Sequence, residues 1–187
     1  MSFVSDQFRF LRALAARPKN VGAVAPSGPQ LAKAMAAQIR LDLVEKGGSV
    51  LELGPGTGAI TGALVARVGA ERLTAVEYDG DFSAGLKARW PAMRVIEGDA
   101  FDLDRTLGHR EPYAAIVSGL PLLNFPMEMR HRLLDGVAAR LMPGASFIQF
   151  SYGLHAPVTP PDGHIVAQAA FCWANMPPAR VWVYRKA

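Results

Sequence analysis

The stretch Val50-Leu-Glu-Leu-Gly-Pro-Gly-Thr-Gly58 decides the fold of this chain. An apolar segment typical of a buried strand leads into a loop with glycine at positions 54, 56 and 58. Because glycine has no Cβ and tolerates positive φ, the backbone of such a loop can approach a ligand closely. The dinucleotide fingerprint is G-x-G-x-x-G, whose third glycine would fall on Ala59. The spacing present is G-x-G-x-G, and Glu52 precedes it by two residues.

A second strand and a carboxylate follow this loop. Residues 72–77, Arg-Leu-Thr-Ala-Val-Glu, predict a strand that ends in Glu77, about 20 residues beyond the glycines, where a doubly wound sheet places the acid that accepts the ribose hydroxyls. A plain turn is the alternative interpretation of the glycines. The strand before them, the helical pattern at 60–68 and Glu77 favour a cofactor site. This combination resembles the nucleotide loop of class I S-adenosylmethionine-dependent methyltransferases.

Composition indicates one globular domain in a reducing compartment. The chain has 187 residues, 50% of them hydrophobic and 19% charged, which suits a single domain with a sizeable core. One cysteine excludes an internal disulfide. The histidines are scattered and form no H-x-x-x-H pair, so we expect no metal site. No apolar run is long enough for a membrane span, and charged residues at 6, 9 and 12 interrupt any signal-peptide core. A cytoplasmic protein is expected.

The positive charge lies at one end of the chain. Residues 1–40 contain six Lys or Arg and one Asp, whereas residues 41–187 contain fourteen bases and fifteen acids. Residues 3–17 fit an amphipathic helix that Pro18 ends. This helix either lies in a membrane interface, with arginines on anionic head groups, or packs on the core of its own domain. In the membrane interpretation the contacting residues are Phe3, Val4, Phe8, Arg9, Phe10, Leu11, Arg12 and Leu14.

The rest of the chain alternates between strands and helices. A capping box of Ser27 and Gln30 predicts a helix that continues to about Arg40. Two closing strands are separated by Pro177-Pro178. The alternation implies an α/β, Rossmann-like, mostly parallel sheet with an antiparallel hairpin at its C-terminal end. The predicted strands are 49–53, 72–77, 93–97, 114–119, 145–151, 164–174 and 179–185, and the predicted helices are 58–68, 81–89 and 126–141.

Ligands of such sheets bind at the carboxyl ends of the strands. Methyltransferases place near Asp99 the group that accepts the adenine amino hydrogen; a turn-forming aspartate is the alternative. Phe101 stacks on the adenine or belongs to the core. A backbone carbonyl near Leu120 is a candidate acceptor for a substrate amine, unless this segment is only a buried loop. The side chains that would offer a wall to a greasy substrate are Leu120, Leu122 and Leu123.

Five segments together resemble the bacterial phospholipid N-methyltransferases, small enzymes that bind membranes and convert phosphatidylethanolamine to phosphatidylcholine. The ribosomal RNA adenine dimethyltransferases resemble the chain more loosely. Enzymes that methylate nucleobase amines usually carry N/D-P-P-Y/F where this chain has Ser118-Gly-Leu-Pro121, and the −1 charge of residues 41–187 also disfavours RNA. The five segments are the N-terminal helix, Gly22–Gly28, Glu52–Gly58, Ser118–Pro126 and Gln149–Gly153.

The resemblance implies a membrane-interface helix at 1–20 and a methyltransferase domain at 21–187. It implies S-adenosylmethionine as cofactor without a metal, and an anionic membrane surface and phosphatidylethanolamine as partners. No nucleic acid is expected, and the enzyme would attach peripherally to the inner leaflet of the cytoplasmic membrane. The implied cofactor-binding residues are Ser27, Glu52, Gly54, Gly56, Gly58, Glu77, Tyr78, Asp99, Ala100, Phe101, Ser118 and Gly119.

The implied reaction is in-line attack of a neutral amine on the sulfonium methyl group. An ammonium has no lone pair, so the amine first loses a proton, and positioning and exclusion of water carry most of the catalysis. The catalytic candidates are Tyr152, Leu120, Pro121 and Tyr78, and the aromatic candidates to hold a methylated cation are Tyr152, Phe125 and Tyr78. The sequence does not rank Arg17, Lys19, Arg180 and Arg185 as ligands of a lipid phosphate. An RNA base methyltransferase and a non-catalytic protein that binds the cofactor and membranes remain alternatives.

Overall fold

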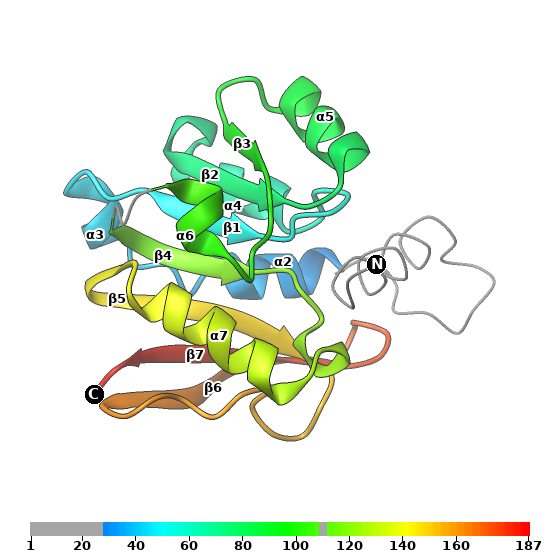
Figure 1. Cartoon of the computed structure of the whole chain (residues 1–187). Coiled ribbons are helices and arrows are strands. Elements are labelled where there is room, and N and C mark those ends of the chain that lie inside the picture. Colours follow the sequence, from blue (N-terminus) through cyan, green and yellow to red (C-terminus); the bar gives the residue numbers. More distant parts are fainter. Residues whose placement is uncertain (1–27, 109–111) are drawn as a thin grey trace.

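A seven-stranded sheet runs through the computed structural model, which describes residues 28–108 and 112–187 (Figure 1). The strand order is β3-β2-β1-β4-β5-β7-β6. Neighbours from β3 to β5 pair in parallel, whereas β7 pairs antiparallel with both β5 and β6. This confirms the predicted parallel sheet with a closing hairpin. The strands are β1 Val50–Leu53, β2 Leu73–Glu77, β3 Arg94–Glu97, β4 Tyr113–Ser118, β5 Leu141–Ser151, β6 His164–Cys172 and β7 Ala179–Lys186.

Helices cover both faces of the sheet. Helices α2, α4 and α5 contribute to one apolar core, and α6 and α7 pack on the opposite face in a second core (Figure 1). Val50 belongs to the first core and Leu51 to the second, because successive residues of a strand point to opposite faces. The helices are α2 Pro29–Ala36, α3 Leu41–Glu45, α4 Thr61–Val68, α5 Gly80–Arg89, α6 Leu103–Leu107 and α7 Met127–Ala138, with short 3-10 turns η1 Ala70–Arg72 and η2 Leu122–Asn124.

Some element ends differ from the sequence prediction. Helix α2 begins after Gly28, which is its N-cap residue without a side-chain cap, and it ends at Ala36 instead of near Arg40. The predicted cap residue Ser27 lies outside the described residues, as does the whole predicted helix at 3–17. Strand β5 begins at Leu141, which pairs with Tyr113 ahead of a register shift. The five-residue helices α3 and α6 were not predicted, since one helical turn gives no readable periodicity.

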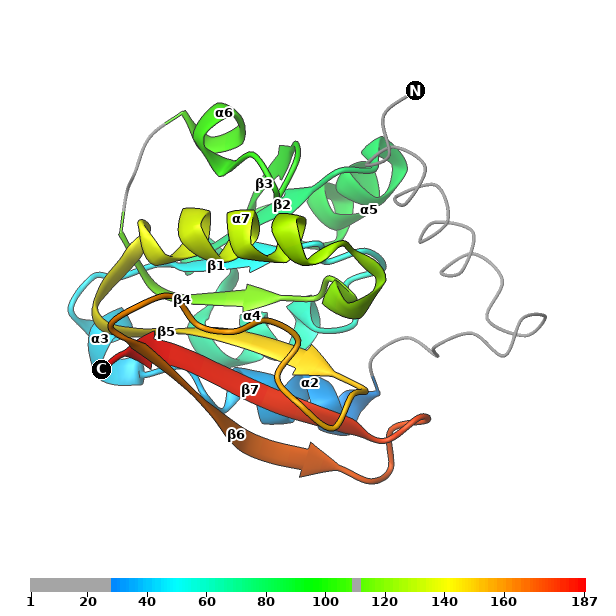
Figure 2. The same cartoon turned by 60° about the horizontal axis from the view of Figure 1, so that its bottom comes forward.

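The antiparallel hairpin returns the chain to the edge where the parallel strands end. Arg180 at the start of β7 pairs with Ser151 at the end of β5, and Cys172 at the end of β6 pairs with Ala179. The β6–β7 turn therefore lies at the carboxyl end of β5 (Figure 2). Within the described ranges, no helix is long and apolar enough to cross a bilayer.

Candidate cofactor and substrate site

The loops predicted to carry the site meet at the carboxyl edge of the sheet. Hydrogen bonds continue the parallel ladder beyond the strands: Gly54 N donates to Val76 O, and Gly119 N donates to Leu53 O. In the same way Gly98 N donates to Glu77 O. The four strand ends are thus held side by side, as the general rule for ligand sites in such sheets requires.

Glycine is needed at each of the three positions of the first loop for a different physical reason. All three have positive φ, a region that residues with a Cβ rarely occupy. A Cβ on Gly54 would lie 2.4 Å from Leu120 Cδ2, and one on Gly58 would lie 2.8 Å from the Trp90 ring. A Cβ on Gly56 would meet nothing within 4 Å. Gly54 and Gly58 therefore allow close packing of the protein on itself, and only Gly56 faces open space that a ligand can fill.

The carboxylate of Glu77 holds the glycine loop. It accepts hydrogen bonds from Gly56 N at 2.8 Å and from Asp79 N at 2.9 Å, one on each oxygen. Burial raises the pKa of Glu77, and the backbone donors at residues 79 and 56 partly counteract the rise. The side chain thus stands where a ribose-binding acid is expected, at the end of β2, and it also fixes the backbone of the loop.

Glu52 is the least satisfied polar group of the site. It is fully buried on β1. Its carboxylate oxygens make no hydrogen bond of normal geometry with the described residues, and neither does the hydroxyl of Thr61 in α4. Burial raises the pKa of Glu52 to about 8; the Thr61 hydroxyl counters the rise, and the charge of Glu77 adds to it. A buried carboxylate without a partner is costly, which indicates a missing cationic or hydrogen-donating ligand.

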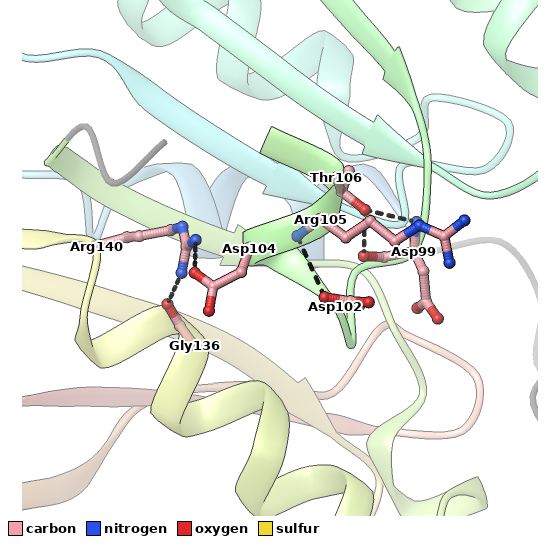
Figure 3. A network of polar contacts seen from close by, with 7 residues as sticks. All are labelled: Asp99, Asp102, Asp104, Arg105, Thr106, Gly136 and Arg140. Carbon is pink, nitrogen blue, oxygen red and sulfur yellow. Dashed lines mark hydrogen bonds and ion pairs between the residues drawn. The ribbon is translucent and has the colours of Figure 1, made fainter. Parts of the chain in front are cut away.

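Asp99 lies in a braced turn after β3. Its Oδ1 accepts from Phe101 N at 2.8 Å, while its backbone NH and carbonyl both bond the Thr106 hydroxyl (Figure 3). The turn-forming role that we kept as an alternative is therefore present. Ala100 and Phe101 are buried, and the Phe101 ring packs on Phe125 with centroids 4.7 Å apart. Phe101 belongs to the core instead of offering a face to adenine.

An ion pair fixes α6, and with it this turn, to α7. Arg140 is almost fully buried, and its guanidinium contacts Asp104 Oδ1 at 2.5 Å and donates to Gly136 O at 2.9 Å (Figure 3). Arg105 N also donates to Asp102 Oδ1 at the start of α6. Removing the Asp104 carboxylate would leave the buried charge of Arg140 without its ion-pair partner. The pair therefore holds α6, whose Thr106 bonds the backbone of Asp99, in place.

The segment after β4 interlocks with the glycine loop. A Cβ on Gly119 would lie 2.6 Å from the carbonyl oxygen of Gly54, so only glycine fits there. Ser118 is buried and its Oγ accepts from Leu120 N. The carbonyl of Leu120 already accepts from Gln149 Nε2 and Leu122 N, both at 2.9 Å. Both lone pairs are used, so this carbonyl is not available to a substrate amine in this conformation.

The predicted leucine wall is reduced to one exposed residue. Leu120, ahead of the short turn η2, and Leu122, within it, are buried in the second core, whereas Leu123 of the same turn is exposed. Phe125 is also a core residue, so it cannot hold a methylated cation at the surface. Pro121 precedes η2 as its N-cap residue. The sequence pattern was the same for all three leucines, and only the turn separates them.

The two tyrosine candidates differ in access. Tyr78 follows β2 directly and is partly exposed beside Glu77. Tyr152 follows β5 and packs against Phe150, with ring centroids 5.4 Å apart. Its hydroxyl oxygen is buried and makes no hydrogen bond of normal geometry with the described residues. Burial raises the pKa of Tyr152, and the nearby Asn175 side chain lowers it only in part. A general base at that oxygen is therefore disfavoured.

Two supporting residues were missed by the sequence prediction. Gln149 on β5 is fully buried, donates to the carbonyls of Leu120 and Phe150, and leaves its Oε1 unpaired among the described residues. Arg130 on α7 donates to the carbonyls of Leu123, Phe125 and Pro157. Gln149 belongs to the segment Gln149–Gly153, whose sequence alone predicts no contact for its side chain. Arg130 stands on an exposed helical pattern, which gives no sign of a bracing role.

Comparison with known proteins identifies the family. A family model described as a methyltransferase domain matches residues 50–144. The ornithine lipid N-methyltransferase of Singulisphaera acidiphila is 34% identical over 154 residues, which cover 79% of each chain. Ribosomal RNA small subunit methyltransferase A of Syntrophotalea carbinolica is 39% identical over 87 residues, 46% of this chain and 32% of that protein.

Solved structures share the fold. The DhpI–SAH complex has a TM-score of 0.65 at 17% identity and covers 98% of this chain and 97% of that one. TrmN from Thermus thermophilus has a TM-score of 0.62 at 21% identity, and this chain, 94% covered, spans 52% of TrmN. At such identities the likeness shows the fold alone. The fold, the glycine loop, the family match and the near full-length relative together show that the chain belongs to the class I S-adenosylmethionine-dependent methyltransferases.

Proposed function

We propose that this methyltransferase acts on the head-group amine of a membrane lipid, with phosphatidylethanolamine as the expected substrate and phosphatidylcholine as the final product. The observation that carries the proposal is the lipid-methylating relative, which matches over most of both chains. The RNA-methylating relative matches over less than half of this chain. Ornithine lipid is the second candidate substrate, because the relative from Singulisphaera acidiphila is named as an ornithine lipid N-methyltransferase.

The residues at the carboxyl edge fit the cofactor. Glu52 is a buried acid without a partner, and the cationic amino group of a methionine moiety is the kind of ligand that would neutralise it. Glu77 would bind the ribose hydroxyls and Asp99 the adenine amino group, with Gly56 leaving room between them. Among the described residues, no cluster of His, Cys, Asp and Glu suited to a metal ion occurs. The absence of a metal from the reaction remains a prediction.

The chain's own groups would orient the amine, and its proton would leave to solvent. When bound, S-adenosylmethionine would supply an electrophilic methyl group to the amine nitrogen, with S-adenosylhomocysteine as the leaving group and the amine proton released to solvent. With the Leu120 carbonyl occupied, the neighbouring Gly119 carbonyl becomes the better acceptor for the amine hydrogen. Among the described residues, no backbone NH of a turn, loop or helix cap donates a hydrogen bond to it. Gln149 would hold Leu120, and with it this segment, in position.

Strand register shows that Arg180 and Arg185, two of the cations considered for the lipid phosphate, lie at different distances from the carboxyl edge. Arg180 pairs with Ser151 at the carboxyl edge, whereas Arg185 pairs with Ser146 deeper along β5, toward the opposite edge. The Arg180 guanidinium lies over the Phe171 ring at 4.7 Å and donates to Gly153 O at 3.3 Å. We assign the phosphate contact to Arg180, because only this edge carries the cofactor site. Arg17 and Lys19 lie outside the described residues.

Labelled S-adenosylmethionine tests this function directly. The protein is incubated with vesicles of phosphatidylethanolamine and phosphatidylglycerol, with vesicles in which ornithine lipid replaces phosphatidylethanolamine, and with ribosomal RNA. We expect label in the lipid extract, strong loss of it in Glu77→Gln, and little change in Glu97→Gln, an exposed acid paired with Glu77 on the neighbouring strand. Label in RNA without label in lipid would refute the proposal, and label in neither substrate would favour a non-catalytic binding protein.

Membrane attachment through the first helix needs a separate measurement. We expect peripheral binding to anionic membranes on the cytoplasmic side, through the apolar and basic faces predicted for residues 3–17. Replacing Phe3, Phe8 and Phe10 with Ser in the full chain should weaken flotation with phosphatidylglycerol vesicles. Cofactor affinity should stay unchanged. Undiminished flotation would refute a membrane-binding role for this helix.

A further inference from the structure

Exposed apolar side chains gather at the carboxyl edge of the sheet. Among the described residues, seven large apolar or aromatic side chains are exposed, and six of them follow a strand end at this edge. The most exposed are Met176 at 81%, Trp173 at 76% and Leu154 at 72%. The seventh is Ile165, near the start of β6 at the other edge. Five of the six lie on the side of β4, β5, β7 and β6; we call them the apolar rim: Leu123, Met127, Leu154, Trp173 and Met176.

The loops that carry the apolar rim contain no charged residue. Residues 118–127, 151–161 and 171–179 lack Asp, Glu, Lys and Arg, although these make up 19% of the chain. The nearest charge along β7 is the cation Arg180. Exposed apolar surface without charge is unfavourable in water and marks a surface that contacts another apolar phase. Tryptophan in such a surface is typical of membrane interfaces.

Hydrogen bonds hold the rim in one shape. Asn175, between Trp173 and Met176, is buried; its Oδ1 accepts from Gly28 N and its Nδ2 donates to Pro177 O, both at 2.9 Å. Arg180 ties the hairpin to Gly153, beside Leu154.

The remaining rim residues are braced from α7 and by ring contacts. Arg130 ties the loop after β4 to the loop after β5 through the carbonyls of Leu123 and Pro157. Trp173 packs edge-on against Phe171, with ring centroids 4.4 Å apart. The apolar side chains therefore project from braced loops, so little conformational entropy is lost when they enter a second phase.

We propose that the apolar rim is a membrane-docking surface of the folded domain, which inserts Trp173, Met176 and Leu154 at the head-group boundary. This inference rests on the proposed function and names the part of the domain that faces the lipid. The rim adjoins Gly119 and the glycine loop through Leu123 and Leu120. Docking in this orientation brings the amine of a membrane lipid to the site while its acyl chains stay in the bilayer.

Vesicle binding of the full chain tests the proposal. Trp173→Ser/Met176→Ser is compared with Ile165→Ser, which removes an exposed apolar side chain from the opposite edge. With vesicles of phosphatidylethanolamine and phosphatidylglycerol, we expect the partition coefficient of the double variant to fall about tenfold or more. The control should stay within about twofold of the parent. Thermal unfolding checks that both variants fold. Binding of the double variant equal to that of the parent would overturn the proposal.

Tryptophan fluorescence locates the contact and tests the other occupants. The difference between the spectra of the parent and of Trp173→Phe isolates Trp173 from Trp90 and Trp182. We expect a blue shift on adding vesicles and quenching by lipids brominated near the head group. A Trp173 signal already blue-shifted and shielded from acrylamide without vesicles would overturn the proposal. If dilution leaves this shielding unchanged, the rim would be covered by residues 1–27 of the same chain. If dilution removes the shielding, the rim would be covered by a second copy of the chain.

Activity separates this proposal from the proposed function. On monomeric short-chain phosphatidylethanolamine, the double variant should match the parent, because no membrane is involved; on vesicles its rate should fall with its binding. If the double substitution leaves methylation of vesicle lipid unchanged, the apolar rim is not the membrane-docking surface, and the proposed function still holds. If the protein binds vesicles through Trp173 but methylates no lipid, the rim is a membrane-docking surface and the proposed function is refuted.

Discussion

The carboxyl edge of the sheet has two halves that differ in charge. The acidic half comprises the end of β2, the loops after β2 and β3 and the first turns of α5 and α6, and it carries Glu77, Asp79, Asp81, Asp99, Asp102 and Asp104. The uncharged half, formed by residues 118–127, 151–161 and 171–179, carries no Asp, Glu, Lys or Arg. The difference teaches that one edge of a sheet can combine fixed hydrogen-bond acceptors with an apolar surface. In the proposed function, the acceptors would bind the charged cofactor and the apolar surface would face the lipid.

The two halves meet where Gly54 and Gly119 pack closely together; we call this contact the seam. Gly54 belongs to the loop that leads into the acidic half, and Gly119 opens the uncharged half. Neither position has room for a Cβ, because each backbone packs on the other segment. A disturbance at the seam should therefore affect both halves, whereas a change within one half should affect only the ligand of that half.

The largest effect is expected from Gly119→Ala. The added methyl group would lie 2.6 Å from the Gly54 carbonyl oxygen, a backbone atom that moves only with its whole loop. We expect a loss of about 3 kcal/mol in the free energy of unfolding, with weaker binding of both cofactor and lipid. The control is Gly85→Ala within α5, where a Cβ meets nothing within 4 Å, and it should stabilise by about 0.5–1 kcal/mol. Urea titration measures the free energy of unfolding of both variants. Equal values for Gly119→Ala and Gly85→Ala would contradict the close packing of Gly119 on Gly54.

Glu52→Gln tests the acidic half. With its pKa raised to about 8 from an ordinary 4.5, folded Glu52 holds a proton that the unfolded chain releases. Its contribution therefore favours folding at low pH and declines as pH rises from about 4.5 to about 8. The parent should lose stability across that window, relative to Glu52→Gln, in thermal melts. A parallel pH dependence of the two proteins would contradict the buried, protonated carboxyl.

The same substitution should alter cofactor binding. A cationic amino group at Glu52 favours the ionised carboxylate, so binding near pH 7 should release about one proton from the parent. Calorimetry in two buffers of different ionisation enthalpy counts this proton. Glu52→Gln should release none and bind S-adenosylmethionine about tenfold to a hundredfold more weakly. Affinity unchanged by the substitution would remove Glu52 from the cofactor site.

Arg180→Ala tests the uncharged half at its cationic margin. Loss of a single phosphate contact near a membrane surface is worth about 1 kcal/mol, so the KM for vesicle lipid should rise about fivefold. Cofactor affinity should stay the same. Arg185→Ala, on the same strand toward the opposite edge, should change neither quantity. Arg180→Lys should restore most of the loss if charge is what matters, and equal effects of the two alanine variants would refute the ranking by register.

The sequence predicted the acidic half better than the uncharged half. Glu77 follows a strand at a set distance from the glycines, and both strands are apolar because helices cover the two faces of the sheet. Position along the chain was therefore sufficient to place that carboxylate. The roles of Gly54 and Gly58 depended on Leu120 and Trp90, contacts across the fold that no local pattern contains.

The uncharged half depends on side-chain direction and on long-range pairing. Leu120, Leu122 and Leu123 are chemically alike, and the turn η2 alone decides that the last one is exposed. Trp173 was predicted as part of the closing strand 164–174, which ends at Cys172 instead, and Met176 was predicted only as a neighbour of the Pro177-Pro178 turn. Asn175 lies between them and is buried, and its hydrogen bond to Gly28 spans 147 residues of sequence. Such contacts become visible only when the chain is folded.

The smallest effect is expected from Tyr152→Phe, which asks whether the uncharged half takes part in proton transfer. The Tyr152 hydroxyl is buried without a normal hydrogen bond to the described residues, and burial raises its pKa. A base must reach the proton that it removes and must be ionised near neutral pH, and this oxygen meets neither requirement. We expect kcat within about threefold of the parent and an unchanged pH profile. A large loss of kcat restricted to the alkaline limb would instead assign the proton to Tyr152, and the uncharged half would then contribute chemistry as well as an apolar surface.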